Sequence, residues 1–140
     1  MNWYKDTIEI STHGKGLYDL TSAVESRIQQ WKIQEGICYL FAPHASASLA
    51  ISENYDPTAK ADLEAFMERL VPESQPWHHH TLEGSDDSPS HMRSMITHSS
   101  LTIPVDEGRL SLGTWQGISL FEHRARGHRR KVLLRCFGIG

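Results

Sequence analysis

The hydrophobic positions of the chain repeat at two periods, one typical of strands and one typical of helices. Residues 3–10 end in alternating apolar and polar positions with β-branched side chains, which predicts a first strand. Between Leu20 and Trp31 the apolar residues recur at the spacing of one helical face. The run Ser22-Ala-Val-Glu25 matches a capping box, so we expect this helix to begin near Thr21.

The middle of the chain predicts two strands and a longer helix. Residues 37–42 form a nearly continuous apolar run that suits a strand buried on both faces, and residues 48–52 alternate. Asp56 can cap a helix, and Pro57 fits its first position. This helix is expected to end before Pro72, because proline cannot continue it.

The second half predicts a long loop, a short helix and several strands. Residues 73–87 show no regular period, and loops of this length in a domain are usually functional or disordered. Ser88-Pro89 signals a helix start, with the helix continuing to about residue 96. Further strands are predicted at residues 101–105, 109–112, 118–122 and 131–137. About seven strands, mostly in hairpins, and two or three helices indicate an α+β fold with a largely antiparallel sheet.

Composition limits the classes of protein that fit this pattern. The 140 residues suit a single domain spanning 1–140, and no apolar run approaches the roughly 20 residues that cross a bilayer. The N-terminus lacks a signal-peptide pattern, so we expect a cytoplasmic protein with no membrane partner. A formal net charge of −3 disfavours nucleic acid as a partner. The two cysteines lie in apolar segments and are expected to be buried free thiols.

Histidine is the residue type that changes this picture. The chain has nine, and two of them, His80 and His91, bound a polar stretch with almost no residues for a core. His91 falls just inside the predicted helix start, where the helix dipole favours the neutral, metal-binding imidazole. His44 directly follows a predicted buried strand. If these three converge, they would suit Zn²⁺ or a similar ion, whereas each one taken singly is better explained as an ordinary polar or structural residue.

The acids between these histidines are candidates for catalytic roles. Glu83, Asp86 and Asp87 are dense enough to repel one another unless a cation is near. They would hold a hard ion such as Mg²⁺, position a metal-bound water or orient the histidines. We assign Glu83 and Asp87 as catalytic candidates. The alternatives are a solvated acidic loop and, for Asp87, a cap of the following helix.

A further set of side chains is predicted to contact a substrate. These residues are Ser46, Ser48, Asn54, Trp115, Gln116 and Arg130. For the two serines, hydrogen bonding to a ligand is favoured over nucleophilic catalysis, because no nucleophile-elbow motif is present. The basic stretch from Arg124 to Lys131 would attract phosphates. The alternatives are turn chemistry for Asn54, core filling for Trp115 and a solvated hairpin tip for the basic stretch.

Five runs that contain many of these residues are spread over the chain. They are His44–Ser48, Glu53–Pro57, His80–His91, Ser99–Val105 and Gly108–Gly117. Taken together, they resemble the YjbQ-like family of small, largely uncharacterised proteins, of which some are described as secondary thiamine-phosphate synthases. Three positions depart from the family pattern: Ala45 stands where threonine is usual, Ser88 where methionine is common and His98 where glycine is common.

The resemblance implies a fold, an assembly and a reaction. The sheet would curl into a barrel or sandwich, and the chain would form a homotrimer with sites near the subunit boundaries. A divalent metal, Zn or Mg, would be held by His44, His80 and His91. The implied reaction joins hydroxymethylpyrimidine diphosphate to thiazole phosphate and releases pyrophosphate, and a divalent ion would stabilise that leaving group.

Two other classes of function fit the same residues. One is a zinc-dependent hydrolase, in which Glu83 or Asp87 would act as the base for a metal-bound water. The other is a non-catalytic trimeric protein that binds a metal or a metabolite. The loss of a hydroxyl at Ala45 bears on substrate contacts in each enzymatic case.

Overall fold

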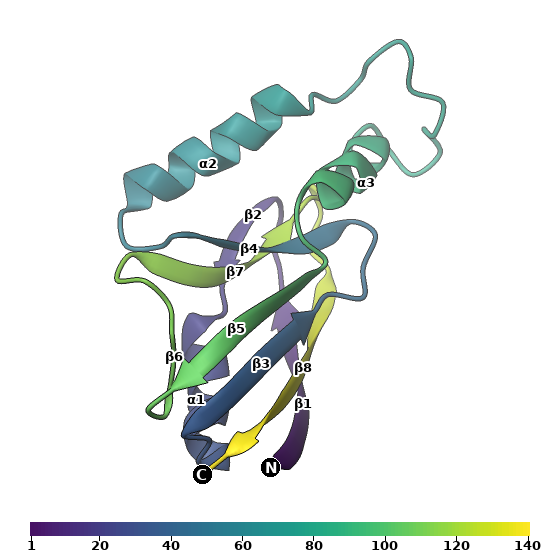
Figure 1. The fold of residues 1–140 in the computed structure, drawn as a ribbon. Coiled ribbons are helices and arrows are strands. Elements are labelled where there is room, and N and C mark those ends of the chain that lie inside the picture. The colour runs from purple at the N-terminus through teal and green to yellow at the C-terminus, as the bar shows by residue number, and fades with distance from the viewer.

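The fold consists of two antiparallel sheets and three helices (Figure 1). The structure is a computed structural model that describes residues 1–140. The five-stranded sheet has the order β1-β8-β3-β5-β6, and the three-stranded sheet has the order β2-β7-β4. The strands are β1 (Asn2–Ser11), β2 (Gly16–Asp19), β3 (Glu35–Phe41), β4 (Ala47–Glu53), β5 (Ser100–Asp106), β6 (Arg109–Leu110), β7 (Gln116–Glu122) and β8 (Arg129–Ile139). The helices are α1 (Thr21–Trp31), α2 (Pro57–Leu70) and α3 (Asp87–Ile96).

The core lies where the inner faces of the two sheets meet α1. Val24 and Ile28 of α1 are fully buried against both sheets, which together curl into a half-barrel (Figure 1). Cys38 and Cys136 face each other across β3 and β8, and both are buried and free. The predicted α+β class, the antiparallel sheet and the buried thiols are therefore confirmed.

Helix α2 covers the outer face of the three-stranded sheet. Its Met67 packs with Leu17 of β2 and Phe121 of β7 in a second, smaller apolar cluster. The helix begins as predicted, because Pro57 is its first residue and the Asp56 side chain accepts the Thr58 backbone N–H. This arrangement leaves polar side chains at the ends of the sheet, beyond the apolar cluster.

The local predictions at the starts of α1 and α3 need correction. α1 begins at Thr21 as predicted, but it has no side-chain cap. Instead of closing a capping box, Glu25 accepts the Leu110 backbone N–H at 3.3 Å, and so joins α1 to β6. α3 begins at Asp87 rather than after Ser88.

Strand β2 was not predicted at all. It has four residues, of which Gly16 and Leu17 are both buried, so no alternation marks it in the sequence. Its pairing with β7 extends from Gly16 opposite Glu122 to Asp19 opposite Ser119. A tertiary contact, not a local pattern, creates this strand.

The outer face of the five-stranded sheet carries large apolar side chains at its surface. Trp3 and Phe137 stack with their ring centroids 6.4 Å apart and are 63% and 38% exposed. Ile37 lies opposite Phe137 on the next strand and is also exposed. An exposed apolar patch of this kind marks an interaction site more often than chance. None of the three helices combines the length and hydropathy required to span a bilayer.

Candidate metal centre

Three side chains bring potential metal ligands to one point near the start of α3. His80 comes from the loop before this helix, and Asp87 and His91 are one helical turn apart on α3. The Asp87 Oδ2 atom lies 2.8 Å from His80 Nε2 and 3.3 Å from His91 Nε2. All three ligand atoms lie within 4.8 Å of one another. We call this group the His80–Asp87–His91 cluster.

The other ring nitrogen of His91 fixes the orientation of the imidazole. His91 Nδ1 lies 2.8 Å from the backbone oxygen of Ala45, which can only accept a hydrogen bond. A neutral His91 therefore carries its proton on Nδ1 and presents the Nε2 lone pair to Asp87 Oδ2. Two lone pairs 3.3 Å apart repel, so either a proton or a metal cation between them is required. A carbonyl acceptor behind a ring nitrogen is the usual partner of a metal-binding histidine.

Arg124 fixes the orientation of the carboxylate. Its Nη1 atom lies 2.9 Å from Asp87 Oδ1, which leaves Oδ2 facing the two imidazoles. The same guanidinium donates through Nε to Asp86 at 2.8 Å and through a terminal nitrogen to the Glu83 backbone oxygen. Burial alone would raise the pKa of Asp86, but the bonds from Arg124 and from the Ala125 N–H lower it below its ordinary value. Arg124 thus joins the start of α3 to the segment after β7.

The donor set fits a divalent transition metal. Two imidazole nitrogens and one carboxylate oxygen form a set that Zn²⁺ and Fe²⁺ accept, and open coordination positions would remain for water or substrate. Asp87 is buried, whereas His80 and His91 are partly exposed, so the cluster opens to solvent on the imidazole side.

His44, the third predicted ligand, does not lie in this cluster. Its Nε2 atom accepts the Lys131 backbone N–H at 3.0 Å, which ties the end of β3 to β8. Burial, together with the charge of Arg130, lowers the pKa of His44. The structure therefore replaces His44 with Asp87 in the candidate ligand set. Ala45 orients His91 through its backbone carbonyl. This contact does not depend on the side chain, so it is unaffected by alanine in place of the usual threonine.

Arg130 and Ser46 lie in a buried polar network beneath the cluster. Arg130 holds the fully buried Glu122 through two bonds, of 2.8 and 2.5 Å, and also donates to the Ser46 hydroxyl. Thr12 completes the network with a 2.6 Å bond to Glu122. Burial alone would raise the pKa of Glu122, but the bonds from Arg130 and Thr12 lower it. The Arg130 guanidinium therefore has its carboxylate partner within the chain.

Ser48 belongs to a buried hydrogen-bond network. Its hydroxyl lies 2.8 Å from His123 Nε2 and 2.6 Å from the Thr97 hydroxyl, which in turn lies 2.7 Å from the Arg93 carbonyl. The single Thr97 proton goes to that carbonyl, so Ser48 donates to Thr97 and accepts from His123. Ser48 is 1% exposed, so contact with a substrate would require these hydrogen bonds to break.

His123 is a residue to which the sequence analysis gave no role. Burial, with the cation of Arg93 behind it, lowers the pKa of His123 to about 3, so the ring is neutral. Its Nδ1 atom is buried without a partner, which is consistent with a bare lone pair there and a proton on Nε2. No local pattern marks this role, because Ser48 and His123 come together only when β4 pairs with β7.

The remaining predicted substrate residues lie at the far end of the same strands. Asn54 follows β4, and its N–H donates to the backbone oxygen of Trp115, just before β7. Gln116 accepts the Gly113 N–H. Seven-residue β4 separates this end from the Ser46 end by about 20 Å. Within one chain, the predicted substrate residues therefore form two separate groups, one at each end of β4. Glu83, the other catalytic candidate, is exposed in the loop before α3.

Comparison with known proteins places this arrangement in a family. The model for the family described as UPF0047 protein YjbQ-like matches residues 6–139. The chain belongs to the YjbQ-like UPF0047 family. The UPF0047 protein sll1880 of Synechocystis is 43% identical over 96% of this chain and 92% of its own. The UPF0047 protein YjbQ of Salmonella typhimurium is 41% identical over 94% of this chain and 95% of its own.

Two solved structures share the fold. A YbjQ-like protein of unknown function from Sulfolobus solfataricus matches with a TM-score of 0.90 and 27% identity, over 99% of each chain. A conserved hypothetical protein from Thermus thermophilus matches with a TM-score of 0.84 and 32% identity, over 94% of this chain and 99% of its own. The fold is thus shared with solved proteins from two distant organisms.

Substitution of Arg130 tests the buried network. We expect Arg130→Met to lower the free energy of unfolding by about 3–5 kcal/mol, because it leaves Glu122 buried without its cation. Arg129→Met is the matched control, since Arg129 forms an exposed pair with Glu9 and should change stability by no more than about 0.5 kcal/mol. Urea unfolding measures both, and equal effects of the two substitutions would contradict the assignment.

The low pKa of His123 makes stability depend on pH. The unfolded chain takes up a proton near pH 6.5, whereas the folded chain does so only near pH 3. The contribution of neutral His123 to the free energy of unfolding is therefore complete above pH 6.5. It is lost as the pH falls towards 3, at up to about 1.4 kcal/mol per pH unit. Between pH 6 and pH 5, His123→Gln should lose about 1 kcal/mol less stability than the wild type. Urea unfolding at each pH measures the stability. His79→Gln, in the exposed loop, should keep the wild-type dependence of stability on pH. A wild-type pH dependence in His123→Gln would contradict the burial of a neutral ring.

Proposed function

We propose that this chain is a metal-dependent enzyme that acts on a phosphorylated small molecule. The observation that supports it is the meeting of His91 Nε2, His80 Nε2 and Asp87 Oδ2, with the proton of His91 committed to the opposite nitrogen. A cation at this point would remove the repulsion between the Nε2 lone pair and the carboxylate. The cluster also opens to solvent at the imidazoles, where a substrate has access.

The reaction that we propose is the one implied by the family resemblance. It joins hydroxymethylpyrimidine diphosphate to thiazole phosphate, forms thiamine phosphate and releases pyrophosphate. A divalent metal held by His80, Asp87 and His91 would supply charge stabilisation for the departing pyrophosphate. The chain itself would keep the ligand atoms in place through the Ala45 carbonyl and the Arg124 guanidinium.

Few cations of the basic stretch are free to attract phosphate. Arg124 pairs with Asp86 and Asp87, Arg129 with Glu9, and Arg130 with Glu122. Arg126 and Lys131 form no ion pair. These two are therefore the residues of this stretch to which we assign steering of a phosphorylated substrate towards the cluster.

Metal binding is the first test of this proposal. Titration of metal-free protein with Zn²⁺ or Mn²⁺ should show one site per chain, with affinity reduced by at least about tenfold in His91→Ala and Asp87→Asn, since each removes a ligand or its charge. His79→Ala is the matched control, because His79 is an exposed loop residue outside the cluster. Isothermal titration calorimetry measures each affinity.

The outcomes separate the metal site from the reaction. Undiminished metal affinity in His91→Ala would contradict the site. Tight binding that His91→Ala abolishes, with no thiamine phosphate formed from the two precursors, would keep the metal site and reject the synthase reaction. Formation of thiamine phosphate that depends on metal and fails in His91→Ala is the expected result.

We also propose that the chain forms a homotrimer through the outer face of the five-stranded sheet. The resemblance implies this assembly, and the exposed apolar side chains of that face support it. They are Trp3, Ile37, Tyr39, Phe41, Phe137 and Ile139. Burial of this patch between copies would remove apolar surface from water.

Light scattering on a sizing column tests the assembly. The wild-type protein should have three times the mass of one chain, and Phe137→Asp should shift it to the monomer by placing a charge in the apolar patch. Leu82→Asp is the control, since Leu82 is 98% exposed in the loop before α3. A monomeric wild type, or a Phe137→Asp protein that keeps the wild-type mass, would contradict this proposal.

A further inference from the structure

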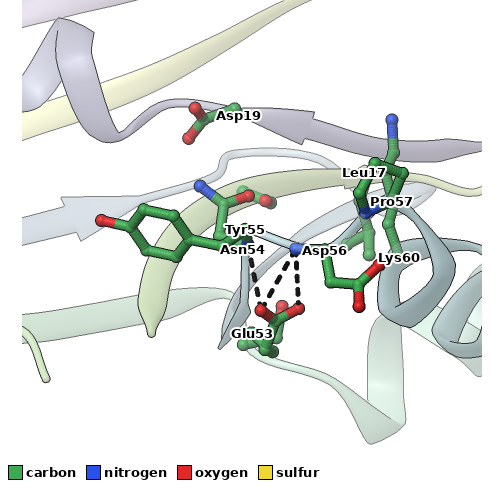
Figure 2. Close-up of a pocket in the computed structure, with 10 residues that line it drawn as sticks. Leu17, Asp19, Glu53, Asn54, Tyr55, Asp56, Pro57 and Lys60 are labelled. Carbon is green, nitrogen blue, oxygen red and sulfur yellow. Dashed lines mark hydrogen bonds between the residues drawn. The ribbon is translucent and has the colours of Figure 1, made fainter. Parts of the chain in front are cut away.

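A cavity lies between α2 and the three-stranded sheet, away from the His80–Asp87–His91 cluster. It has a volume of about 260 Å³, opens to solvent, and is bordered by the first turn of α2, the end of β4, β2 and the middle of β7 (Figure 2). Leu17, Ser52 and Ser119 line it from the three-stranded sheet, and Asp19, Asn54, Tyr55 and Lys60 are among its other lining residues. We call it the α2 cavity.

Four of the side chains that line the α2 cavity, those of Ser52, Asn54, Lys60 and Ser119, have no hydrogen-bond partner within the chain. Ser119 is only 3% exposed, yet its hydroxyl makes no hydrogen bond and is not sealed from the cavity. The side chains of Ser52, Asn54 and Lys60 also form no hydrogen bond. The hydrogen bonds drawn in Figure 2 join the backbone N–H groups of Tyr55 and Asp56 to the Glu53 carboxylate, which accepts them. The Ser119 hydroxyl therefore faces the cavity, where it is free to bond a ligand or water.

The position of Asn54 depends on a glycine beneath it. A Cβ atom at Gly117 would lie 2.3–2.4 Å from the Asn54 side chain, which therefore lies directly on the β7 backbone. Tyr55 follows Asn54, and its ring meets Trp115 edge to face at a centroid distance of 5.5 Å. The absence of a side chain at position 117 thus allows an amide and an aromatic ring to border the same cavity.

Two opposite charges border the α2 cavity without pairing with each other. One Asp19 oxygen accepts the Thr21 N–H, and the other has no partner. Lys60 forms no ion pair, and Glu64, one helical turn away, accepts the Leu17 N–H instead. Figure 2 shows Asp19 and Lys60 on opposite sides of the cavity. The carboxylates of Glu53 and Asp56 are committed to backbone N–H groups at the start of α2.

We propose that the α2 cavity binds a small zwitterion of amino-acid size. The ammonium group of the ligand would pair with Asp19, and its carboxylate would pair with Lys60. Ser119, Ser52 and Asn54 would supply neutral hydrogen bonds to the remaining polar atoms. Ligands with one charge would meet an unmatched charge on one wall of the cavity, whereas a zwitterion satisfies both. This proposal does not depend on the metal cluster.

A titration with L-serine tests this proposal. Nuclear magnetic resonance should show saturable shifts of the Ser119 and Asn54 amides, with a dissociation constant in the millimolar range. Ethanolamine lacks the carboxylate and 3-hydroxypropionate lacks the ammonium group, so each should bind at least about tenfold more weakly than L-serine, because one charge-assisted bond is lost. Glycerol, which has no charge, serves as the neutral comparison.

Matched variants connect the binding to the α2 cavity. Asp19→Asn keeps the acceptor for the Thr21 N–H and removes the charge, and Lys60→Met keeps the aliphatic stem, so each should weaken L-serine binding at least tenfold. Asp62→Asn on the exposed side of α2 and Lys5→Met on β1 are the controls and should not change it. Equal binding of glycerol, no saturable response to L-serine or glycine, or undiminished binding in both Asp19→Asn and Lys60→Met would overturn the proposal. His91→Ala should keep L-serine binding, which separates this test from that of the metal site.

Discussion

The candidate site depends first on the guanidinium of Arg124. This side chain binds Asp86, Asp87 and the Glu83 backbone oxygen together, so one cation joins the loop before α3 to the segment after β7. It also leaves a single Asp87 oxygen facing His80 and His91. Without Arg124, three carboxylates near the start of one helix would repel one another. The geometry of the His80–Asp87–His91 cluster is therefore a consequence of an ion pair between segments almost forty residues apart.

A second layer of polar contacts supports the same end of the half-barrel. The buried pair of Arg130 and Glu122 holds Ser46, and the hydrogen bonds of Ser48 connect β4 to α3 through Thr97. Such networks are costly to leave unsatisfied, so they fix the spacing between β4, β7 and α3. That spacing places the Ala45 carbonyl behind the His91 ring. The same two strands, β4 and β7, also border the α2 cavity through Ser52 and Ser119.

The sequence allowed the fold class and most elements to be predicted, because the apolar periods of residues 20–31 and the cap at Asp56 are local signals. It did not reveal β2, whose four residues form a strand only through pairing with β7. In the site, the polar loop drew attention to His80 and His91, which the structure brings together with Asp87. The exchange of His44 for Asp87 was not predictable from residue type, since imidazole and carboxylate groups are both common metal ligands. The i, i+4 spacing of Asp87 and His91 on one helix was the available clue. The role of His123 depends on a contact between distant strands and has no local signature.

The central claim is that the His80–Asp87–His91 cluster holds a divalent metal ion. The most direct measurement is anomalous diffraction from crystals grown with Zn²⁺ or Mn²⁺, with data collected at the absorption edge of the added metal. The account predicts one anomalous peak per chain, within about 2.3 Å of His80 Nε2, His91 Nε2 and an Asp87 carboxylate oxygen. A metal ion bound only by other residues would contradict it. So would a significant anomalous signal in the data with no peak at this cluster.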